Sequence, residues 1–313
     1  MQDLGEEQVS ATRASIVLVN KGDAAIARTL AALSRIESSH LGEIVVVDAS
    51  KRALETIRQS FPLVTWIDYE NDTKKTRTIA EQRNVGIASS SGDVVVFLDA
   101  NCIPSSGWLE RLIAPIVTEG EQIVVGRITS PGGVSIHDAA SPQGGRDAAY
   151  LEECANMNVA YRRDVLAQLG GFDEQLGFAE DVDFAWRARD AGHRIRFEPA
   201  AEVVHDWGTA QAELTRAFRY GVARVRLYRK HTSRLGNLVR SDRYITAYAL
   251  YVLASPVALV YPPYMLLLLY PIIKNRGHRP LLTVAYHLLY ALGVISELFY
   301  VPTFRRVPWR PPR

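Results

Sequence analysis

The chain has 313 residues, of which 48% are hydrophobic, so it can bury one large domain core and carry an appendage. Its formal net charge of +2 gives no whole-protein case for a nucleic-acid partner. Two cysteines, Cys102 and Cys154, cannot build a disulfide framework or a cysteine metal cluster, which favours a reducing cytosolic setting. Residues Met1–Ser10 are acidic and polar, so we expect no secretory signal there and a main domain that stays in the cytosol.

Strand and helix patterns alternate along the first part of the chain. Apolar runs predict strands, and leucine and isoleucine at helical spacing predict the helices between them. The strands are expected over Ser15–Asn20, Glu43–Asp48 and Leu63–Ile67, and the helices over Asp23–Arg35, Lys51–Ser60 and Thr76–Ser90. This alternation is typical of βαβ units and a mostly parallel sheet. The predicted fold class is therefore α/β.

A dinucleotide-binding dehydrogenase is the first rival for such a fold. That class needs G-x-G-x-x-G after the first strand, and this chain has Asn20-Lys21-Gly22-Asp23 at that place. A nucleotidyltransferase on a related sheet needs a Gly-rich basic loop there, for which Lys21-Gly22 is a thin match. Both rivals are therefore weak.

Val94–Asn101 reads VVVFLDAN and is the centre of the pattern. An unbroken apolar run leads into Asp99-Ala100-Asn101, which predicts a strand that is buried on both faces and ends in polar groups. Ligands of open α/β sheets lie at the carboxyl ends of strands, so Asp99 and Asn101 are placed to hold a divalent cation and a diphosphate. An Asx turn that simply closes the strand is the alternative.

A long Gly-, Ser- and Pro-rich stretch interrupts the second half of the domain. It covers Ser130–Gly145 and is expected to be a surface loop that acts as a lid or binding segment, with a disordered spacer as the alternative. The elements expected around it are a helix near Ser106–Thr118, a strand over Gln122–Arg127, a helix that follows Asn156–Arg163 and ends at Gly170-Gly171, a helix over Glu180–Ala191, and short strands over Arg194–Phe197 and Ala201–Val204.

Acidic residues open the helix that begins at Glu180. Carboxylates in a first turn favour the positive end of the helix, but such capping needs only one of them. Since Phe184 and Trp186 are expected to pack inward, at least one of Asp181 and Asp183 should look into a cleft. His205, at the end of the last strand, is a candidate third ligand for the site at Asp99, with a structural histidine as the alternative.

Over about Ser15–Gly221 the chain resembles the family 2 glycosyltransferases of GT-A fold. The matching segments, in order, are the apolar first strand, VVVDAS, EQRNVGIASSSGDVVVFLDAN, NMNVAYRRDVLAQLGGFDE, EDVDFAWRARDAGHRI and FEPAAEVVHDWG. The resemblance implies transfer of a sugar, with inversion, from a nucleotide-sugar donor, for which a UDP-sugar is favoured. It implies a base or ribose contact for Asp48, a donor-binding helix carrying Arg83 and Asn84, the D-x-D metal position for Asp99 and Asn101, a completing metal ligand in His205, and a general base in Asp181 with Glu180 as close competitor.

The chemistry of sugar transfer suits these residue types. A divalent cation, Mg²⁺ or Mn²⁺, stabilises a departing diphosphate, and a carboxylate takes the proton of the acceptor hydroxyl. The chain departs from the family at Asn101, a neutral ligand that should weaken the hold on the cation relative to two carboxylates. We therefore expect the metal to bind together with the donor.

A basic segment, Glu213–His231, follows the resemblance. It predicts a helix with arginines beside aromatic residues, which suits a membrane surface and the phosphate of a lipid carrier, with a solvated helix face as the alternative. We expect Arg216, Arg219 and Trp207 to serve the acceptor or its lipid phosphate.

Two apolar stretches, Tyr244–Ile273 and Leu281–Val301, are each long enough to cross a bilayer, which takes about 20 residues. Adjacent prolines Pro262-Pro263 break the first stretch, and the basic loop Lys274–Arg279 favours the cytosol. Two membrane-embedded hairpin elements with both ends cytosolic are favoured, with two plain spans as a near equal. A soluble helical hairpin is the third possibility.

The sequence thus predicts five segments, namely an N-terminal tail (1–12), a GT-A domain (13–212), a basic interfacial helix (213–240), membrane-associated helices forming an apolar hairpin (241–303) and a basic tail (304–313). The expected protein is a glycosyltransferase at the cell membrane with its catalytic domain in the cytoplasm and a lipid-linked or cell-surface saccharide as acceptor. A catalytically silent membrane subunit that binds a nucleotide or a partner transferase is the alternative, motivated by Asn101.

Overall fold

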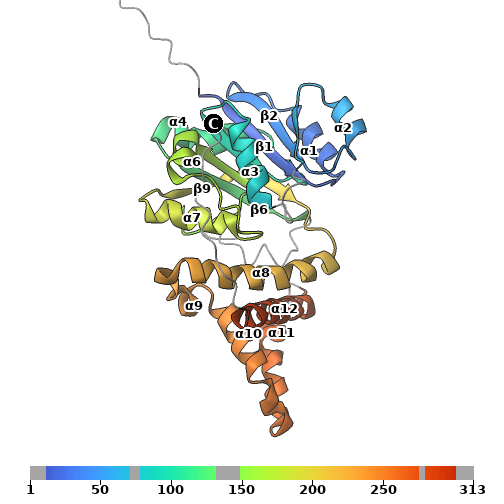
Figure 1. Cartoon of the computed structure of the whole chain (residues 1–313), viewed down its shortest axis with the longest axis vertical. Helices are drawn as coiled ribbons and strands as arrows, with labels where there is room; N and C mark the ends of the chain where they lie inside the picture. Colours follow the sequence, from blue (N-terminus) through green and yellow to red (C-terminus); the bar gives the residue numbers. More distant parts are fainter. Residues whose placement is uncertain (1–11, 71–77, 132–148, 275–278, 301–313) are drawn as a thin grey trace, which may run out of the picture.

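The computed structural model describes residues 12–70, 78–131, 149–274 and 279–300. Its centre is a mixed sheet with the strand order β3-β2-β1-β4-β8-β6-β9-β5, and β7 pairs with β9 (Figure 1). The strands are β1 (Ala14–Asn20), β2 (Leu41–Asp48), β3 (Thr65–Asp68), β4 (Val94–Leu98), β5 (Cys102–Pro104), β6 (Ile123–Thr129), β7 (Tyr150–Leu151), β8 (Asn158–Arg162) and β9 (Ile195–His205).

Helices cover both faces of this sheet. The helices of the sheet domain are α1 (Ile26–Leu33), α2 (Glu55–Ser60), α3 (Ile79–Ala88), α4 (Trp108–Glu119), α6 (Arg163–Leu169) and α7 (Glu180–Asp190). Helices α1 and α4 pack on one face, and α3, α6 and α7 pack on the other (Figure 1). The predicted α/β class is confirmed.

Strand β4 lies in the middle of the sheet, as its unbroken apolar sequence predicts. Val94, Val96 and Leu98 belong to the core under α1 and α4, whereas Val95 and Phe97 belong to the core under α3 and α7. The strand pairs in parallel with β1 and antiparallel with β8. Because both faces are buried, the strand is rigid, and it delivers the residues that follow it to a fixed place.

Two strands depart from the simple alternation of strands and helices that the sequence predicts. The segment before α6 was expected only to lead into a helix, but residues 158–162 form β8, which runs antiparallel between β4 and β6. The two short strands expected over Arg194–Phe197 and Ala201–Val204 are one strand, β9, with an irregularity opposite Gly126 and Arg127. Exposed Pro199 and Ala200 lie at that irregularity.

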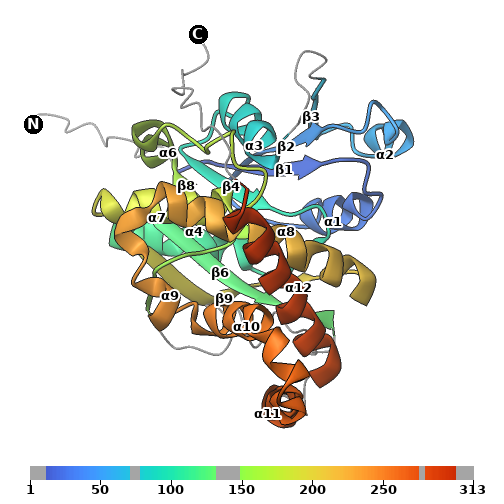
Figure 2. The same ribbon diagram turned by 60° about the horizontal axis from the view of Figure 1, so that its bottom comes forward.

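The basic segment forms helix α8 (Ala210–Lys230), which lies beneath the sheet domain. Helix α12 (Pro280–Leu298) crosses α8 (Figure 2). At the crossing, a Cβ added to Gly221 would lie 2.0 Å from the carbonyl oxygen of Tyr290, and one added to Gly293 would lie 2.1 Å from that of Phe218. The two backbones therefore touch, and α12 is docked on the rest of the chain.

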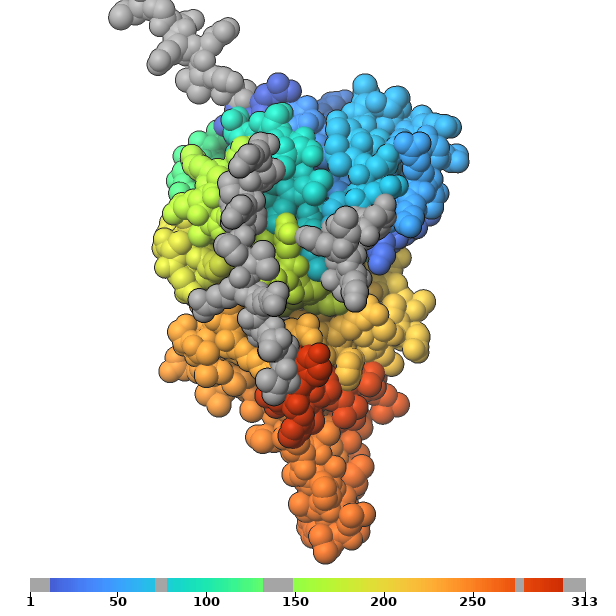
Figure 3. All heavy atoms as spheres, viewed as in Figure 1, coloured from blue at the N-terminus to red at the C-terminus, as the bar shows by residue number. Residues whose placement is uncertain are grey.

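The first apolar stretch does not form one helix. It is divided into α10 (Arg243–Leu253), η3 (Ser255–Leu259), η4 (Pro262–Leu268) and α11 (Leu269–Lys274), after the short η2 (Thr232–Arg234) and α9 (Asn237–Arg240). An uninterrupted span through this stretch, one of the two sequence alternatives, is therefore wrong. Its pieces form a projection that points away from the sheet domain (Figure 3). Pro256 and Pro262 sit at the N-termini of η3 and η4, where they cannot continue a preceding helix.

Within the described residues, α12 is the one helix long and apolar enough to cross a membrane, with a mean hydropathy of 1.6. A third of its apolar window is buried inside the chain. The loop expected over Ser130–Gly145 lies almost wholly outside the described residues, as do the predicted terminal tails.

Candidate active site

Asp99 and His205 meet because two short segments pair far apart in the sequence. Strand β5 starts three residues after Asp99 and runs antiparallel to the end of β9, so that Cys102 lies opposite His205. The His205 Nε2 is 3.9 Å from the Asp99 Oδ2. Asn101 lies beside them, and its amide nitrogen donates a hydrogen bond of 2.7 Å to the carbonyl oxygen of Asp206.

These residues fit a divalent cation as part of its coordination. Burial lowers the pKa of His205, so the imidazole is neutral at pH 7, and its buried Nδ1 has no hydrogen-bond partner. A neutral imidazole facing a carboxylate at 3.9 Å is close enough to share one cation with it. Within the described residues, no group of three His, Cys, Asp and Glu side chains could hold a metal by itself. The protein thus offers Asp99, His205 and the amide oxygen of Asn101.

Arg83 connects the two acidic parts of the site. Its guanidinium forms a close ion pair with Glu180 and lies 3.7 Å from the Asp99 carboxylate. The side chain is buried between the rings of Phe97 and Phe172, with its central carbon about 5.9 Å and 5.8 Å from the ring centres. The pairing occupies Glu180, whereas no ion pair to Asp181 is found among the described residues. This difference favours Asp181 as the carboxylate available for proton transfer.

Asp181 lies on the first turn of α7, in a strained and buried setting. Ala179, just before the helix, has φ +62°, a left-handed conformation that is uncommon for a residue with a Cβ. Burial raises the pKa of the Asp181 carboxyl, although the charge of Arg83 and hydrogen bonds from the backbone N–H groups of Val182 and Asn156 oppose this. A raised pKa brings the carboxylate closer to the range in which a general base works well.

One large cavity of about 1010 Å³ joins these groups to the C-terminal helices. On the sheet-domain side it is lined by Arg83, Asp99, Asn101, Glu180, Asp181 and His205. On the other side it is lined by residues of α8, α10 and α12, among them Arg216, Tyr220, Arg224, Arg243, Tyr286 and Tyr290. The predicted metal and base residues therefore face one shared space whose far wall is the C-terminal part of the chain.

The predicted acceptor residues divide between two cavities. Trp207 and Arg216 line the large one, where the Trp207 ring centre is 4.3 Å from that of His205 and the Arg216 guanidinium donates to the Trp207 carbonyl. Arg219 instead lines a neighbouring cavity of about 320 Å³ with Lys21 at the end of β1, and its guanidinium lies over the Phe178 ring. Arg219 is thus on the side of the first strand and away from His205.

Two of the predicted donor residues line neither cavity. Asp48 is buried at the end of β2, where its carboxylate accepts hydrogen bonds from the backbone and hydroxyl of Ser50. The Asn84 side chain exchanges two hydrogen bonds of 2.9 Å with the backbone of Phe172. In this geometry Asn84 holds the segment before α7 in place. The donor contacts of both residues stay predictions.

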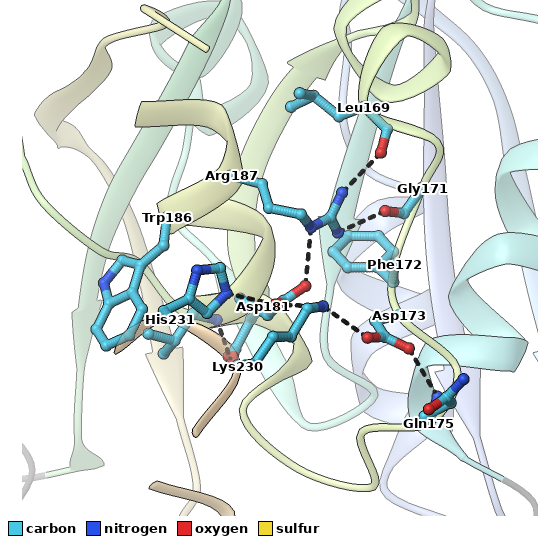
Figure 4. A network of polar contacts seen from close by, with 12 residues as sticks. Leu169, Gly171, Phe172, Asp173, Gln175, Asp181, Trp186, Arg187, Lys230 and His231 are labelled. Carbon is cyan, nitrogen blue, oxygen red and sulfur yellow. Dashed lines mark hydrogen bonds and ion pairs between the residues drawn. The ribbon is translucent and has the colours of Figure 1, made fainter. Parts of the chain in front are cut away.

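A buried network fixes α8 against the helix that carries the acids. The Asp183 side chain is fully buried and pairs with Arg187 at 2.9 Å, with Lys230 at 2.6 Å and with the His231 Nε2 at 2.8 Å. Figure 4 shows Arg187 reaching on to the carbonyl oxygens of Leu169 and Gly171, and Lys230 reaching Asp173. Asp183 therefore serves the architecture, and of the two acids considered for the cleft it is Asp181 that lines the cavity.

Sequence reasoning missed the far wall of the cavity. Tyr220, Tyr286 and Tyr290 line it, yet none was singled out, and Glu153 and Asn156 on the sheet-domain side of the cavity were not singled out either. Tyr286 and Tyr290 are four residues apart in an apolar segment, and this spacing on one helix face was the available signal. The packing of α12 on α8, which brings them to the site, leaves no comparable mark in the sequence.

Residues 15–168 match the family model of glycosyl transferase family 2. The pre-mycofactocin glycosyltransferase of Mycobacterium tuberculosis is 32% identical over 184 residues, which cover 55% of this chain and 39% of that protein. The succinoglycan biosynthesis protein ExoM of Rhizobium meliloti is 31% identical over 217 residues, which cover 64% of this chain and 69% of ExoM. The chain thus spans about two fifths of the first relative's length.

A solved structure extends the likeness to the whole fold. The mannosyltransferase PcManGT from Pyrobaculum calidifontis, in complex with GDP-Man and Mn²⁺, has a TM-score of 0.60 at 18% identity, covering 92% of this chain and 87% of that one. This confirms the predicted GT-A architecture. The family-model match and the identity to ExoM over more than two thirds of its length show that the chain belongs to glycosyl transferase family 2.

Proposed function

We propose that this protein transfers a sugar, with inversion, from a nucleotide-sugar donor to an acceptor hydroxyl at a membrane surface. The observation that carries the proposal is the convergence of Asp99, His205 and Asp181 on one cavity, with Arg83 between the two acidic groups. The M. tuberculosis relative, a glycosyltransferase, and PcManGT, a mannosyltransferase in complex with GDP-Man and Mn²⁺, support it. A UDP-sugar is the favoured donor.

Each residue then has a distinct task. Asp181 accepts the proton of the acceptor hydroxyl as the new glycosidic bond forms, and no carboxylate nucleophile is needed for an inverting reaction. Asp99, Asn101 and His205 would hold Mg²⁺ or Mn²⁺, which, when bound, stabilises the negative charge of the departing diphosphate. Arg83 pairs with Glu180, whose pKa burial raises to about 7 against the opposing charge of Arg83, and it thereby orients the first turn of α7.

The donor is proposed to bring part of the metal's coordination with it. The chain supplies one carboxylate, one imidazole and one amide at this place, and hard cations that prefer oxygen ligands usually take six ligands. The diphosphate oxygens of the donor are the remaining source. We also propose base or ribose contacts for Asp48, a supporting role in the donor-binding helix for Asn84, and acceptor contacts for Trp207, Arg216 and Arg219.

The C-terminal part supports an acceptor held at a membrane. Apolar side chains on the projection are more than half exposed, among them Leu250, Leu259, Val260, Leu266, Leu267, Tyr270 and Ile273. Monomeric soluble proteins rarely expose so large a continuous apolar surface. We propose that the projection enters one leaflet of the cell membrane from the cytoplasmic side. A lipid-linked or cell-surface saccharide is then the natural acceptor, because it lies in the same layer.

The deciding experiment measures nucleotide diphosphate release by the detergent-solubilised chain with UDP-, GDP- and dTDP-sugars, with and without Mn²⁺. Metal-dependent release that is abolished in Asp99→Ala is expected. Asp181→Asn should lose turnover and still bind the donor, whereas Glu180→Gln should retain part of the turnover. Absence of sugar-nucleotide binding by the wild-type chain would overturn the proposal.

A further inference from the structure

The large cavity has a second charged end that the transfer chemistry leaves unused. It lies where α9 meets α10, and Arg240, Ser241, Arg243 and Tyr244 line it there. This end opens on the side from which the apolar projection departs. The cavity therefore runs from the reactive carboxylate Asp181 to the base of the segment that we propose enters the membrane.

The arginines at this end differ from three arginines of α8, which are paired with acids. Arg224 pairs with Glu153 at 3.2 Å and Asp242 at 3.1 Å, and Arg226 and Arg229 both pair with Glu297. In the described part of the chain, neither Arg240 nor Arg243 has an ion pair. Arg243 instead lies over the ring of Tyr244, with its central carbon 5.3 Å from the ring centre. Asp242, which lies between them in the sequence and lines the same cavity, is already engaged by Arg224 and by the Tyr228 hydroxyl, which donates to it at 2.7 Å. Two arginines without an acidic partner of their own can therefore bind an anion here.

The surroundings indicate which anion fits. Directly after Arg243, helix α10 carries exposed Leu250 and Leu253 into the projection. The same cavity is lined by the aromatic side chains of Tyr244, Tyr286 and Tyr290. A molecule that follows this path has an anionic group at the arginines, an apolar chain along α10 and its other end toward Asp181. A saccharide joined through a phosphate to a single long apolar alcohol meets all three requirements.

We propose that Arg240 and Arg243 bind the phosphate of a polyprenyl-type lipid that carries the acceptor saccharide. This inference rests on the proposed function, because it names the acceptor class for the same cavity. Guanidinium groups match phosphate oxygens by two parallel hydrogen bonds, and such charge-assisted pairs are strong where part of the contact is shielded from water. The ordinary phosphate headgroups of the bilayer are the competing source of the same chemistry.

The test compares lipid sources by flotation of the full-length chain with vesicles. Phosphatidylcholine vesicles carry equal mole fractions of a polyprenyl phosphate, of the uncharged polyprenol, or of phosphatidic acid, which has the same phosphate monoester on two acyl chains. Wild-type protein should bind the polyprenyl phosphate vesicles about tenfold more tightly than either control, as expected for one charge-assisted contact per arginine in a partly wet site. The double variant Arg240→Gln/Arg243→Gln should lose this preference.

Arg279→Gln is the matched control, because Arg279 is an exposed arginine of the same C-terminal part that does not line the cavity. This variant should weaken binding to the polyprenyl phosphate vesicles and to the phosphatidic acid vesicles equally. It should leave the preference for polyprenyl phosphate intact. Equal binding of polyprenyl phosphate and phosphatidic acid by wild type would overturn the inference and leave a general headgroup contact. A preference that survives in the double variant would overturn it as well.

Donor binding separates this inference from the proposed function. UDP-sugar binding with Mn²⁺ is measured on the same preparations and should be unchanged in the double variant, because no ion pair or hydrogen bond in the described residues joins Arg240 or Arg243 to Asp99 or His205. If wild type binds the donor but shows no lipid preference, only the inference fails. If wild type binds no sugar nucleotide, the proposed function fails. The assignment of this lipid as acceptor then fails with it, even where the lipid preference is observed.

Discussion

Replacing Asp183 with asparagine tests whether the buried network between α7 and α8 holds the two helices together. Burial raises the pKa of the Asp183 carboxyl, but the hydrogen bond from His231 and the charges of Arg187 and Lys230 outweigh it and bring the pKa from the ordinary 3.8 to about 2. At about 1.4 kcal/mol per pKa unit, this corresponds to roughly 2 kcal/mol of stability at neutral pH. Because the folded-state pKa is the lower one, this stability is present above pH 4 and is lost as the pH falls toward 2.

Asp183→Asn should therefore unfold more easily at pH 7 by roughly 2 kcal/mol, or roughly 5 °C in Tm for a chain of this size. Thermal unfolding in detergent, followed by circular dichroism, measures the effect. Asp190→Asn is the control on the same helix, since Asp190 pairs with Arg234 at the surface and should contribute within about 0.5 kcal/mol. Equal Tm values for Asp183→Asn and wild type would refute the electrostatic reasoning.

Three other predictions concern the site and its far wall. Gly221→Ala should separate α8 from α12 and lower Tm, because its Cβ would lie 2.0 Å from the Tyr290 carbonyl oxygen. Gly236→Ala is the control and should be neutral or slightly stabilising, because nothing lies within 4 Å of the added Cβ. An unchanged Tm in Gly221→Ala would contradict the close crossing. Asn101→Asp should tighten Mn²⁺ binding without donor by roughly tenfold in calorimetry, and tight binding by wild type alone would count against joint binding of metal and donor. Since burial raises the pKa of Asp181, kcat/KM should fall about tenfold per pH unit below a midpoint above 3.8, while a profile flat to pH 4 would argue against Asp181 as base.

Much of the sheet domain could be predicted because its signals are local. The unbroken apolar run of β4 predicts a strand buried on both faces, and the capping box of Thr78 and Glu81 marks where α3 begins. The position of β8 could not be predicted in this way. Its insertion between β4 and β6 depends on hydrogen bonds to strands more than 30 residues away, and local sequence carries no record of which edge a strand joins.

The candidate site shows the same division. Asp99 and Asn101 were predicted as a pair because they end a buried strand, and His205 was predicted as a third ligand because it ends the last strand. Packing distinguishes the three acids of this segment. Arg83 pairs with Glu180, Lys230 at the end of α8 pairs with Asp183, and Asp181 lines the cavity. Three neighbouring carboxylates of the same chemistry can be told apart only by the partners that tertiary structure brings to each.

The sequence alone determined the α/β class, the central strand and the apolar nature of the tail, because periodicity, composition and motif spacing are properties of neighbouring residues. Only the tertiary structure decided that the tail folds back onto the sheet domain. The contact depends on Gly221 and Gly293, which lie 72 positions apart and let two helix backbones touch. That crossing brings Tyr286 and Tyr290 into the cavity that Asp181 also lines. The far wall of the cavity therefore comes from a segment whose composition predicts only association with a membrane.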